Sequence, residues 1–224
     1  MAADAPTQWV PLLAGLALLL ARGSPTSACS CAPQHPQSAY CQADLVLRAR
    51  FMGLSQASSN ASASYVRYEI KTSKVLKGPV SGQDLRYLET PTLESLCGYQ
   101  HAAPLRGEEY VVAASFEDGR ATVTSCSFIQ PWAELSLGQH RGLMQAYEKG
   151  CHCQVLPCQA LPCTVTSDSQ CLWMDRLSGH GWQGTQAQRF ACLPHSRSPP
   201  GPTPGLPLCT WQLLKARGAL PAHQ

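Results

Sequence analysis

The chain has 224 residues, 44% of them hydrophobic and 14% charged, and its formal net charge is +3 at pH 7. So small an excess of positive charge argues against a nucleic-acid-binding protein, which normally carries a strongly basic surface. The length is enough for one large domain or two small ones.

An apolar run at Val10–Ala21 has the length of a signal-peptide core and is too short to span a bilayer. Cleavage after Ala28 would leave small residues at the −1 and −3 positions. One feature departs from the usual pattern, because the first nine residues contain Asp4 and no Lys or Arg. We predict that residues 1–28 are a signal peptide and that the protein is secreted into the extracellular space. No later segment is long and apolar enough for membrane insertion.

Twelve cysteines follow the predicted signal peptide, at positions 29, 31, 41, 97, 126, 151, 153, 158, 163, 171, 192 and 209. An even number of cysteines in a secreted chain predicts a disulfide framework, although spacing alone does not give the pairing. No C-x-x-C motif occurs, which argues against a thioredoxin-like redox site. The stretch Cys151-His152-Cys153 could instead bind zinc, but secretion favours disulfides.

The stretch CSCAP at positions 29–33 becomes the N-terminus once the signal peptide is removed. The free α-amino group and the carbonyl of Cys29 then lie side by side, and disulfides from Cys29 and Cys31 would hold them still. Such a pair is a bidentate ligand for a metal ion on another protein. Because two prolines interrupt residues 29–41, we predict an extended arm there and no helix.

Five segments are predicted as strands, and their bounds are Asp44–Met52, Tyr65–Leu76, Leu85–Thr90, Glu109–Phe116 and Arg120–Phe128. The second is the clearest, because Val66, Tyr68 and Ile70 alternate with charged residues at the period of two expected of a strand. Asp118-Gly119 predicts a hairpin turn between the last two segments. Five short strands in about a hundred residues indicate a small closed barrel of the OB type.

One helix is predicted after the strands, where Ser136 and Gln139 form a capping-box pattern. Leu137, Met144 and Tyr147 follow at helical spacing, and we predict that this stripe packs in the core. The expected fold class is therefore mainly β with one or two helices.

The segment after Cys151 has a different character, with six cysteines in the last 72 residues and little strand or helix pattern. Disulfides must supply much of the stability of so small a unit. We predict an N-terminal barrel domain over residues 29–151 and a small disulfide-rich domain over residues 152–224. The Pro-rich stretch Ser196–Pro207 is expected to be an extended surface loop.

A Ser- and Ala-rich loop is predicted at Gly53–Ser64, between the first two strands, and it contains the sequence Asn60-Ala61-Ser62. This is an acceptor pattern for N-glycosylation, which takes place on surface loops of secreted proteins. We predict that Asn60 is glycosylated.

Motifs of hydrolytic enzymes are missing from the sequence, since neither H-E-x-x-H nor G-x-S-x-G occurs and the seven histidines are scattered. Glu108 and Glu109 are adjacent and would point to opposite faces of a strand, which is expected of a solvated strand start. We therefore predict that the protein is not an enzyme.

The chain resembles the tissue inhibitors of metalloproteinases over its whole length after residue 28. The C-x-C arm directly after a signal peptide and the order of all twelve cysteines are specific features. Within the family, SCSFIQPW and the short loop with the Asn60 sequon are most similar to the first-numbered member. The stretches that carry the resemblance are CSCAPQHPQSAYC at 29–41, DLVLRARF at 44–51, RYEIK at 67–71, ESLCGY at 94–99, SCSFIQPW at 125–132, LSLGQHRG at 135–142, CLWMD at 171–175 and LCTW at 208–211.

The resemblance implies six disulfides and a netrin-like barrel of OB type. The sequence departs from the family in the single residue between Cys151 and Cys153, where the family often has two, and in the length of the Pro-rich stretch. The implied pairs are Cys29–Cys97, Cys31–Cys126, Cys41–Cys151, Cys153–Cys209, Cys158–Cys163 and Cys171–Cys192.

The resemblance also implies inhibition of zinc-dependent matrix metalloproteinases in a one-to-one complex. The amine and carbonyl of Cys29 would chelate the catalytic zinc of the enzyme, and Ser30 would enter its specificity pocket. The protein would need no cofactor of its own. The residues expected to contact the proteinase are Cys29, Ser30, Cys31, Ala32, Pro33, Glu94, Ser95, Leu96 and Cys97.

Further partners implied by the family are related metalloproteinases, a proenzyme bound through the C-terminal domain and a cell-surface receptor, with the inhibitor a monomer. The C-terminal tail is not acidic, which argues against docking through an acidic tail. A rival interpretation is a secreted netrin-like module that binds a receptor or the extracellular matrix without inhibiting a protease. Such modules need not begin with C-x-C, and this feature favours the inhibitor.

Overall fold

The structure, a computed structural model, describes residues 29–56, 65–79, 85–195 and 208–215. The predicted signal peptide, the Asn60 sequon and the Pro-rich stretch at 196–207 lie outside these ranges. Among the described residues, no helix is long and apolar enough to cross a bilayer.

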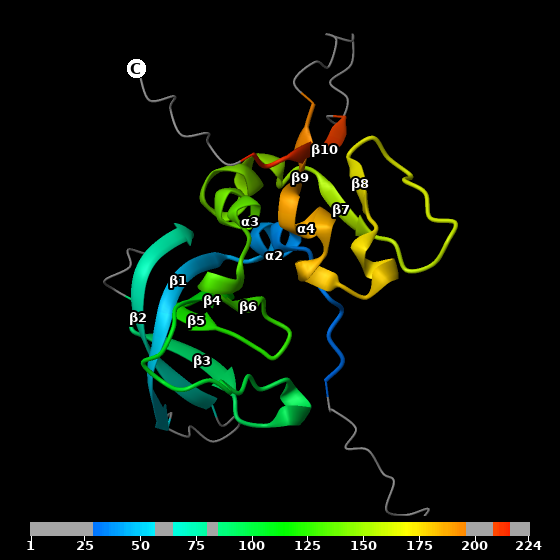
Figure 1. Ribbon diagram of the computed structural model, residues 1–224. Helices are drawn as coiled ribbons and strands as arrows, with labels where there is room; N and C mark the ends of the chain where they lie inside the picture. The colour runs from blue at the N-terminus through cyan, green and yellow to red at the C-terminus, as the bar shows by residue number, and fades with distance from the viewer. Residues whose placement is uncertain (1–28, 57–64, 80–84, 196–207, 216–224) are drawn as a thin grey trace, which may run out of the picture.

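A closed barrel forms the first part of the molecule (Figure 1). Its strands pair in the order β1-β2-β3-β5-β4, and β4 pairs back onto β1 and closes the ring. A short strand, β6, pairs with the first residues of β4 beside β5. The strands are β1 (Leu45–Gln56), β2 (Tyr65–Lys77), β3 (Tyr87–Pro91), β4 (Tyr110–Glu117), β5 (Arg120–Thr122) and β6 (Ile129–Pro131).

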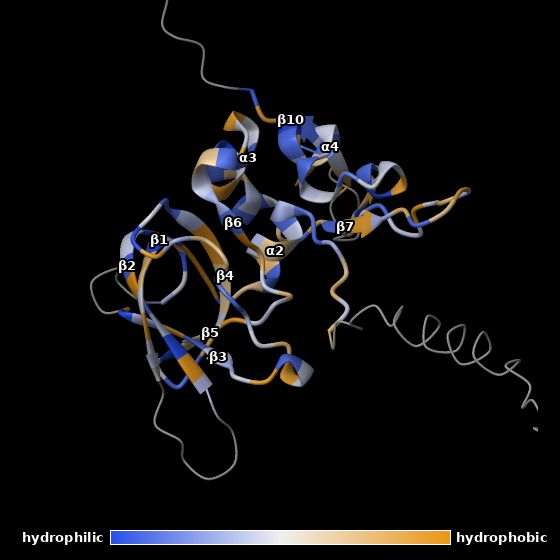
Figure 2. Cartoon of the chain, turned by 60° about the horizontal axis from the view of Figure 1, so that its bottom comes forward, coloured by the Kyte–Doolittle hydropathy of each residue, from blue (hydrophilic) through white to orange (hydrophobic). Residues whose placement is uncertain are grey.

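The interior of the barrel is filled by alternate residues of its strands. On β2, Tyr68 and Ile70 are buried in the core while Glu69 and Lys71 are exposed. Phe51 of β1 and Leu88 of β3 are also buried there. Hydrophobic segments, orange in Figure 2, occur on the strands of the barrel. The predicted five-stranded barrel is therefore confirmed.

The prediction of one continuous strand over Arg120–Phe128 is wrong. Strand β5 ends at Thr122 and β6 begins at Ile129. A tight turn separates them, in which the amide of Ser127 donates to the carbonyl of Thr124 at 3.0 Å. The predicted hairpin turn is present, because Asp118 and Gly119 both have positive φ angles, 50° and 76°, as such a turn requires.

A helix at Pro36–Gln42, α2, contradicts the prediction that residues 29–41 contain none. Proline is tolerated at the first position of a helix, where its missing N–H has no partner to lose. His35 caps the helix, because its Nδ1 accepts a hydrogen bond from the amide of Gln37 at 3.1 Å. Within residues 29–41, the first seven lack regular structure, and residues 29–33 form the exposed arm.

The predicted capping box of Ser136 and Gln139 begins α3 (Leu137–Arg141). The predicted core stripe is only partly correct, because Tyr147 is buried but Leu137 and Met144 are 71% and 46% exposed. The chain leaves α-helical geometry after Arg141, so the regular helical spacing that the prediction assumed does not continue as far as Tyr147. A π-helical turn at Gly142–Ala146 and a 3-10 turn at Tyr147–Gly150 follow α3.

The part of the chain after Cys151 has more regular structure than predicted. Its strands are short, and periodicity is hard to detect over four or five residues. Strands β7 and β8 pair in parallel, and β9 and β10 pair antiparallel. The elements are β7 (Gln154–Pro157), β8 (Gln170–Trp173), α4 (Thr185–Arg189), β9 (Phe190–Pro194), β10 (Cys209–Leu213), and 3-10 turns at Asp175–Ser178 and Gly181–Gln183.

Helix α2 lies between the barrel and this C-terminal part (Figure 1). The side-chain amide of the buried Gln37 donates to the carbonyls of Gly150 and Cys192, at 3.0 and 2.7 Å. Its oxygen accepts from the amide of Cys192 at 2.8 Å. A second buried amide, that of Gln139, donates to the carbonyl of Trp182 at 2.7 Å. These bonds join the helices to backbone groups far along the chain.

Stability should fall as pH falls below about 6.5, the ordinary pKa of histidine. Burial among Tyr147, Trp173 and Trp211 lowers the pKa of His35 to about 3, although Asp175 opposes the shift. Below pH 6.5 the unfolded chain therefore binds a proton at His35 that the folded protein excludes until about pH 3. Between about pH 6.5 and pH 3, His35 lowers the free energy of unfolding by about 1.4 kcal/mol for each unit that the pH falls.

Urea unfolding of the protein and of the His35→Asn variant at several pH values tests this prediction. Asparagine is also a good helix cap but does not titrate. The variant should show a shallower pH dependence, and His152→Asn at an exposed position is the matched control. Equal slopes for His35→Asn and the unaltered protein would contradict it.

Candidate functional site

The structure brings the arm at residues 29–33 together with the turn that follows β3. The disulfide Cys29–Cys97 makes this connection, with a Cα–Cα distance of 5.5 Å. A second disulfide, Cys31–Cys126, joins the arm to a neighbouring loop, with a Cα–Cα distance of 5.2 Å. Figure 1 shows the arm running from α2 alongside this turn. Residues predicted from two distant parts of the sequence therefore lie on one edge of the molecule.

The turn that carries Cys97 is tightly bonded. Its 3-10 turn spans Glu94–Leu96, and the amide of Cys97 donates to the carbonyl of Glu94 at 2.9 Å. Cys97 itself has a left-handed backbone, with φ of 59°. A Cβ on Gly98 would lie 2.2 Å from the carbonyl oxygen of Pro91, so only glycine fits at this position.

A loop at residues 124–127 holds the other anchor of the arm, Cys126. The amide of Ser125 donates to the carbonyl of Cys97 at 2.8 Å, which ties this loop to the turn. The Oγ1 of Thr124 accepts from the amide of Cys126 at 3.2 Å. Both anchors of the arm are thus fixed to each other as well as to the arm.

The edge is exposed and nearly uncharged. Cys29 is partly exposed, the next four residues of the arm are exposed, and so are Glu94, Ser95 and Leu96. Glu94 is the only charged residue in the arm and the turn, and its carboxylate accepts from the Nε2 of Gln100 at 3.3 Å. We call residues 29–33 and 93–97 the N-terminal edge.

Leu93 belongs to the N-terminal edge but was missed from the sequence. Its side chain is 58% exposed, like that of Leu96 at 53%. An apolar residue between strand and turn gives no sequence signal of exposure, because the same residue could equally close the barrel core. Two exposed leucines beside an extended arm provide apolar area for contact with a partner.

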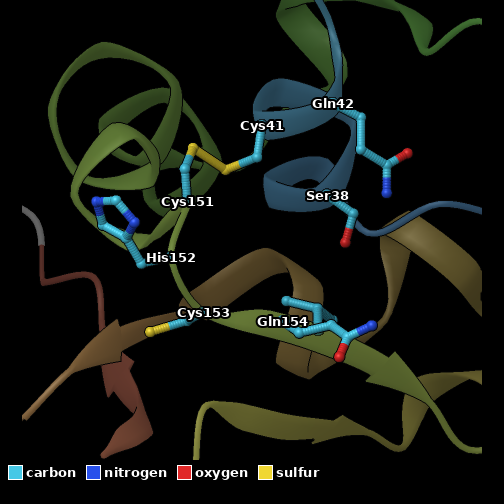
Figure 3. A pocket seen from close by; sticks show the side chains of 8 residues that line it. Ser38, Cys41, Gln42, Cys151, His152, Cys153 and Gln154 are labelled. Atoms are coloured by element: carbon cyan, nitrogen blue, oxygen red, sulfur yellow. A yellow bond between two sulfur atoms is a disulfide. The ribbon is translucent and has the colours of Figure 1, made fainter. Parts of the chain in front are cut away.

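The six disulfides of the structure join the same pairs that the resemblance implies. The zinc interpretation of Cys151-His152-Cys153 is wrong, because Cys151 is bonded to Cys41 and Cys153 to Cys209. Figure 3 shows the Cys41–Cys151 disulfide in the wall of a small pocket below α2. The sulfur atoms of Cys153, Cys192 and Cys209 lie within 4.8 Å of one another, but all three belong to disulfides.

Two histidines and the glutamate pair have structural contacts away from the N-terminal edge. His101 stacks on Phe51 with ring centroids 4.0 Å apart, and burial lowers its pKa. His140 stacks on Trp132 at 4.4 Å. Glu109 forms an ion pair with Arg48, so it is not the freely solvated residue that was predicted. None of these contacts brings an acid and a base together as a catalytic pair.

Comparisons with known proteins place the chain among inhibitors. The family model described as tissue inhibitor of metalloproteinase matches residues 27–199. Metalloproteinase inhibitor 3 of Scyliorhinus torazame is 36% identical over 213 residues, which cover 93% of this chain and 92% of the relative. Human metalloproteinase inhibitor 2 is 36% identical, and the match covers 95% of this chain and 92% of the human protein. Mouse metalloproteinase inhibitor 4 is 36% identical, and the match covers 85% of this chain and 87% of the mouse protein. The likeness to the first-numbered member stays a prediction.

Proposed function

The chain belongs to the tissue inhibitor of metalloproteinase family, and we propose on this premise that it inhibits zinc-dependent matrix metalloproteinases in a tight, non-covalent, one-to-one complex. Its relatives are named as inhibitors, and the protein is an inhibitor rather than an enzyme. The proposal includes secretion and cleavage after Ala28. Related metalloproteinases, a proenzyme and a receptor are further candidate partners.

Cys29 is the proposed ligand of the catalytic zinc of the target enzyme. A catalytic zinc has three protein ligands and an open position that holds water. The α-amino group and carbonyl of Cys29 would take that position and displace the water. The amine must lose its proton to bind, and zinc favours the neutral form of a group whose ordinary pKa is about 7.7–8.0.

The observation that carries the proposal is the fixing of an exposed arm by Cys29–Cys97 and Cys31–Cys126. A short contact gives high affinity only when little freedom is lost on binding. The arm is anchored at its first and third residues, and both anchors are bonded to each other through the amide of Ser125. The ligating atoms are thereby held in place before the enzyme arrives.

The remaining roles follow from position on the N-terminal edge. Ser30 comes directly after the zinc-binding residue and would enter the specificity pocket. Cys31, Ala32 and Pro33 would extend along the primed side, as a substrate does. The turn at 93–97 would contact the unprimed side, since Cys97 is bonded to Cys29.

We expect Ser30→Gly to weaken inhibition by about tenfold for some proteinases and less for others, because it removes the side chain that fills the pocket. Inhibition constants against several catalytic domains measure the effect. Ser178→Gly, at an exposed position in the C-terminal part, is the control. Unchanged constants across the panel would show that Ser30 is not the pocket residue.

Titration of the protein beginning at Cys29 against a matrix metalloproteinase catalytic domain tests the function. Complete inhibition at one equivalent is the expected result. A folded protein that inhibits no metalloproteinase would overturn the proposal and favour the netrin-like binding module.

Mass spectrometry of secreted material tests the cleavage after Ala28 and the glycosylation of Asn60.

A further inference from the structure

A cavity of about 260 Å³ lies on the outer wall of the barrel, outside the N-terminal edge. Strands β2, β3 and β5, the two residues before β3 and the hairpin turn before β5 contribute its walls. Its lining residues are Arg67, Leu85, Arg86, Tyr87, Glu89, Gly119, Arg120 and Ala121. Three of the eight carry a guanidinium group, and one carries a carboxylate.

Glu89 organises the cavity. It is only 5% exposed although it lies on the polar face of β3, and it stands opposite Arg67 of β2 in the strand register. The Nε of Arg67 donates to its Oε1 at 2.7 Å, and Nη1 of Arg120 lies 3.8 Å from its Oε2. A buried carboxylate that holds two guanidinium groups fixes the direction in which they face.

The lining has an excess of positive charge, three arginines against one glutamate, which leaves two charges unbalanced (3 − 1 = 2). Arg86 has no ion-pair partner among the described residues. The side chains of Arg67 and Arg120 remain 42% and 58% exposed, so ligands can reach them. Glu69 and Glu117 stand opposite Tyr87 and Arg120 in the register but do not line the cavity.

We propose that this cavity binds one tetrahedral oxyanion, a sulfate or phosphate group, either as the free dianion or as an ester on a sugar. Two unbalanced charges match a dianion, and guanidinium groups bond such oxygens in pairs. The cavity is smaller than the roughly 300 Å³ at which sites for drug-sized ligands begin, which suits a single anionic group. Tyr87, 44% exposed at the rim, offers a flat ring to the rest of an ester.

Titration of the protein with sodium sulfate, sodium phosphate and glucosamine 6-sulfate tests the proposal, with backbone amide shifts as the readout and sodium chloride at matched ionic strength as the reference. We expect saturable shifts at Arg86, Gly119 and Ala121 with the tetrahedral oxyanions and not with chloride. Tighter binding of the sugar ester would identify the ester as the ligand, and equal binding would identify the free ion. Shifts that chloride reproduces would overturn the proposal.

The variants Arg86→Gln and Arg120→Gln should each weaken binding of sulfate about three- to fivefold, the range expected of a partly exposed ionic contact. Arg67 is left unaltered because it satisfies the buried Glu89. The matched control is Arg189→Gln, an exposed residue of α4 with the same change of charge. If all three variants weakened sulfate binding equally, the anion would be attracted by the overall charge of the protein rather than bound in the cavity, and the proposal would be overturned. Inhibition of a proteinase should stay unchanged, so the two proposals fail separately.

Discussion

Retaining Ala28 ahead of Cys29 should raise the inhibition constant for a metalloproteinase catalytic domain on the order of a thousandfold, equivalent to about 4 kcal/mol of binding free energy. The extra residue converts the ligating amine into an amide, whose nitrogen has no available lone pair for zinc. It also adds bulk where the proposed complex places the metal. Active-site titration of the two forms side by side measures the difference.

The extended form needs a control for folding and for reversibility. Its six disulfides and its unfolding midpoint should match those of the form that begins at Cys29, because the arm is anchored by Cys29 and Cys31 in both. Removal of Ala28 by an aminopeptidase should restore inhibition. Full potency of the extended form would contradict chelation by the amine while leaving the inhibitory function in place.

The second large effect is expected of Gln37→Ala, which should lower the free energy of unfolding by about 3 kcal/mol. The side-chain amide of Gln37 satisfies the carbonyls of Gly150 and Cys192 and the amide of Cys192. The residue is 1% exposed, so water does not replace these bonds without a rearrangement. Urea unfolding at pH 7 measures the loss.

Gln42→Ala is the matched control, because Gln42 lies on the same helix with an exposed side chain. Its substitution should change the unfolding free energy by less than about 0.5 kcal/mol. Equal stability of the Gln37→Ala and Gln42→Ala variants would mean that the buried amide adds nothing at the junction of α2 with the C-terminal part.

Local patterns in the sequence were enough to predict the main elements of the barrel. Strand β2 alternates with a period of two because one of its faces is buried, and that pattern is present whatever the strand pairs with. The capping box at Ser136 and Gln139 is equally local, since both bonds are made within one turn. The proposed zinc ligand also follows from the sequence, through the C-x-C stretch and its resemblance to a known family.

Features that depend on distant partners could not be predicted. Helix α2 is short, and its buried Gln37 is satisfied by backbone groups more than a hundred residues away. Leu137 and Met144 are exposed although their spacing suits a buried helix face, because the packing of other elements decides which face is covered.

The arginine cavity has the same origin, because the partnership of Arg67, Glu89 and Arg120 is set by the order and register of three strands. A residue's own neighbours along the chain determine the period and caps of an element. Only the packing of elements against one another determines which polar groups meet and which side chains stay exposed.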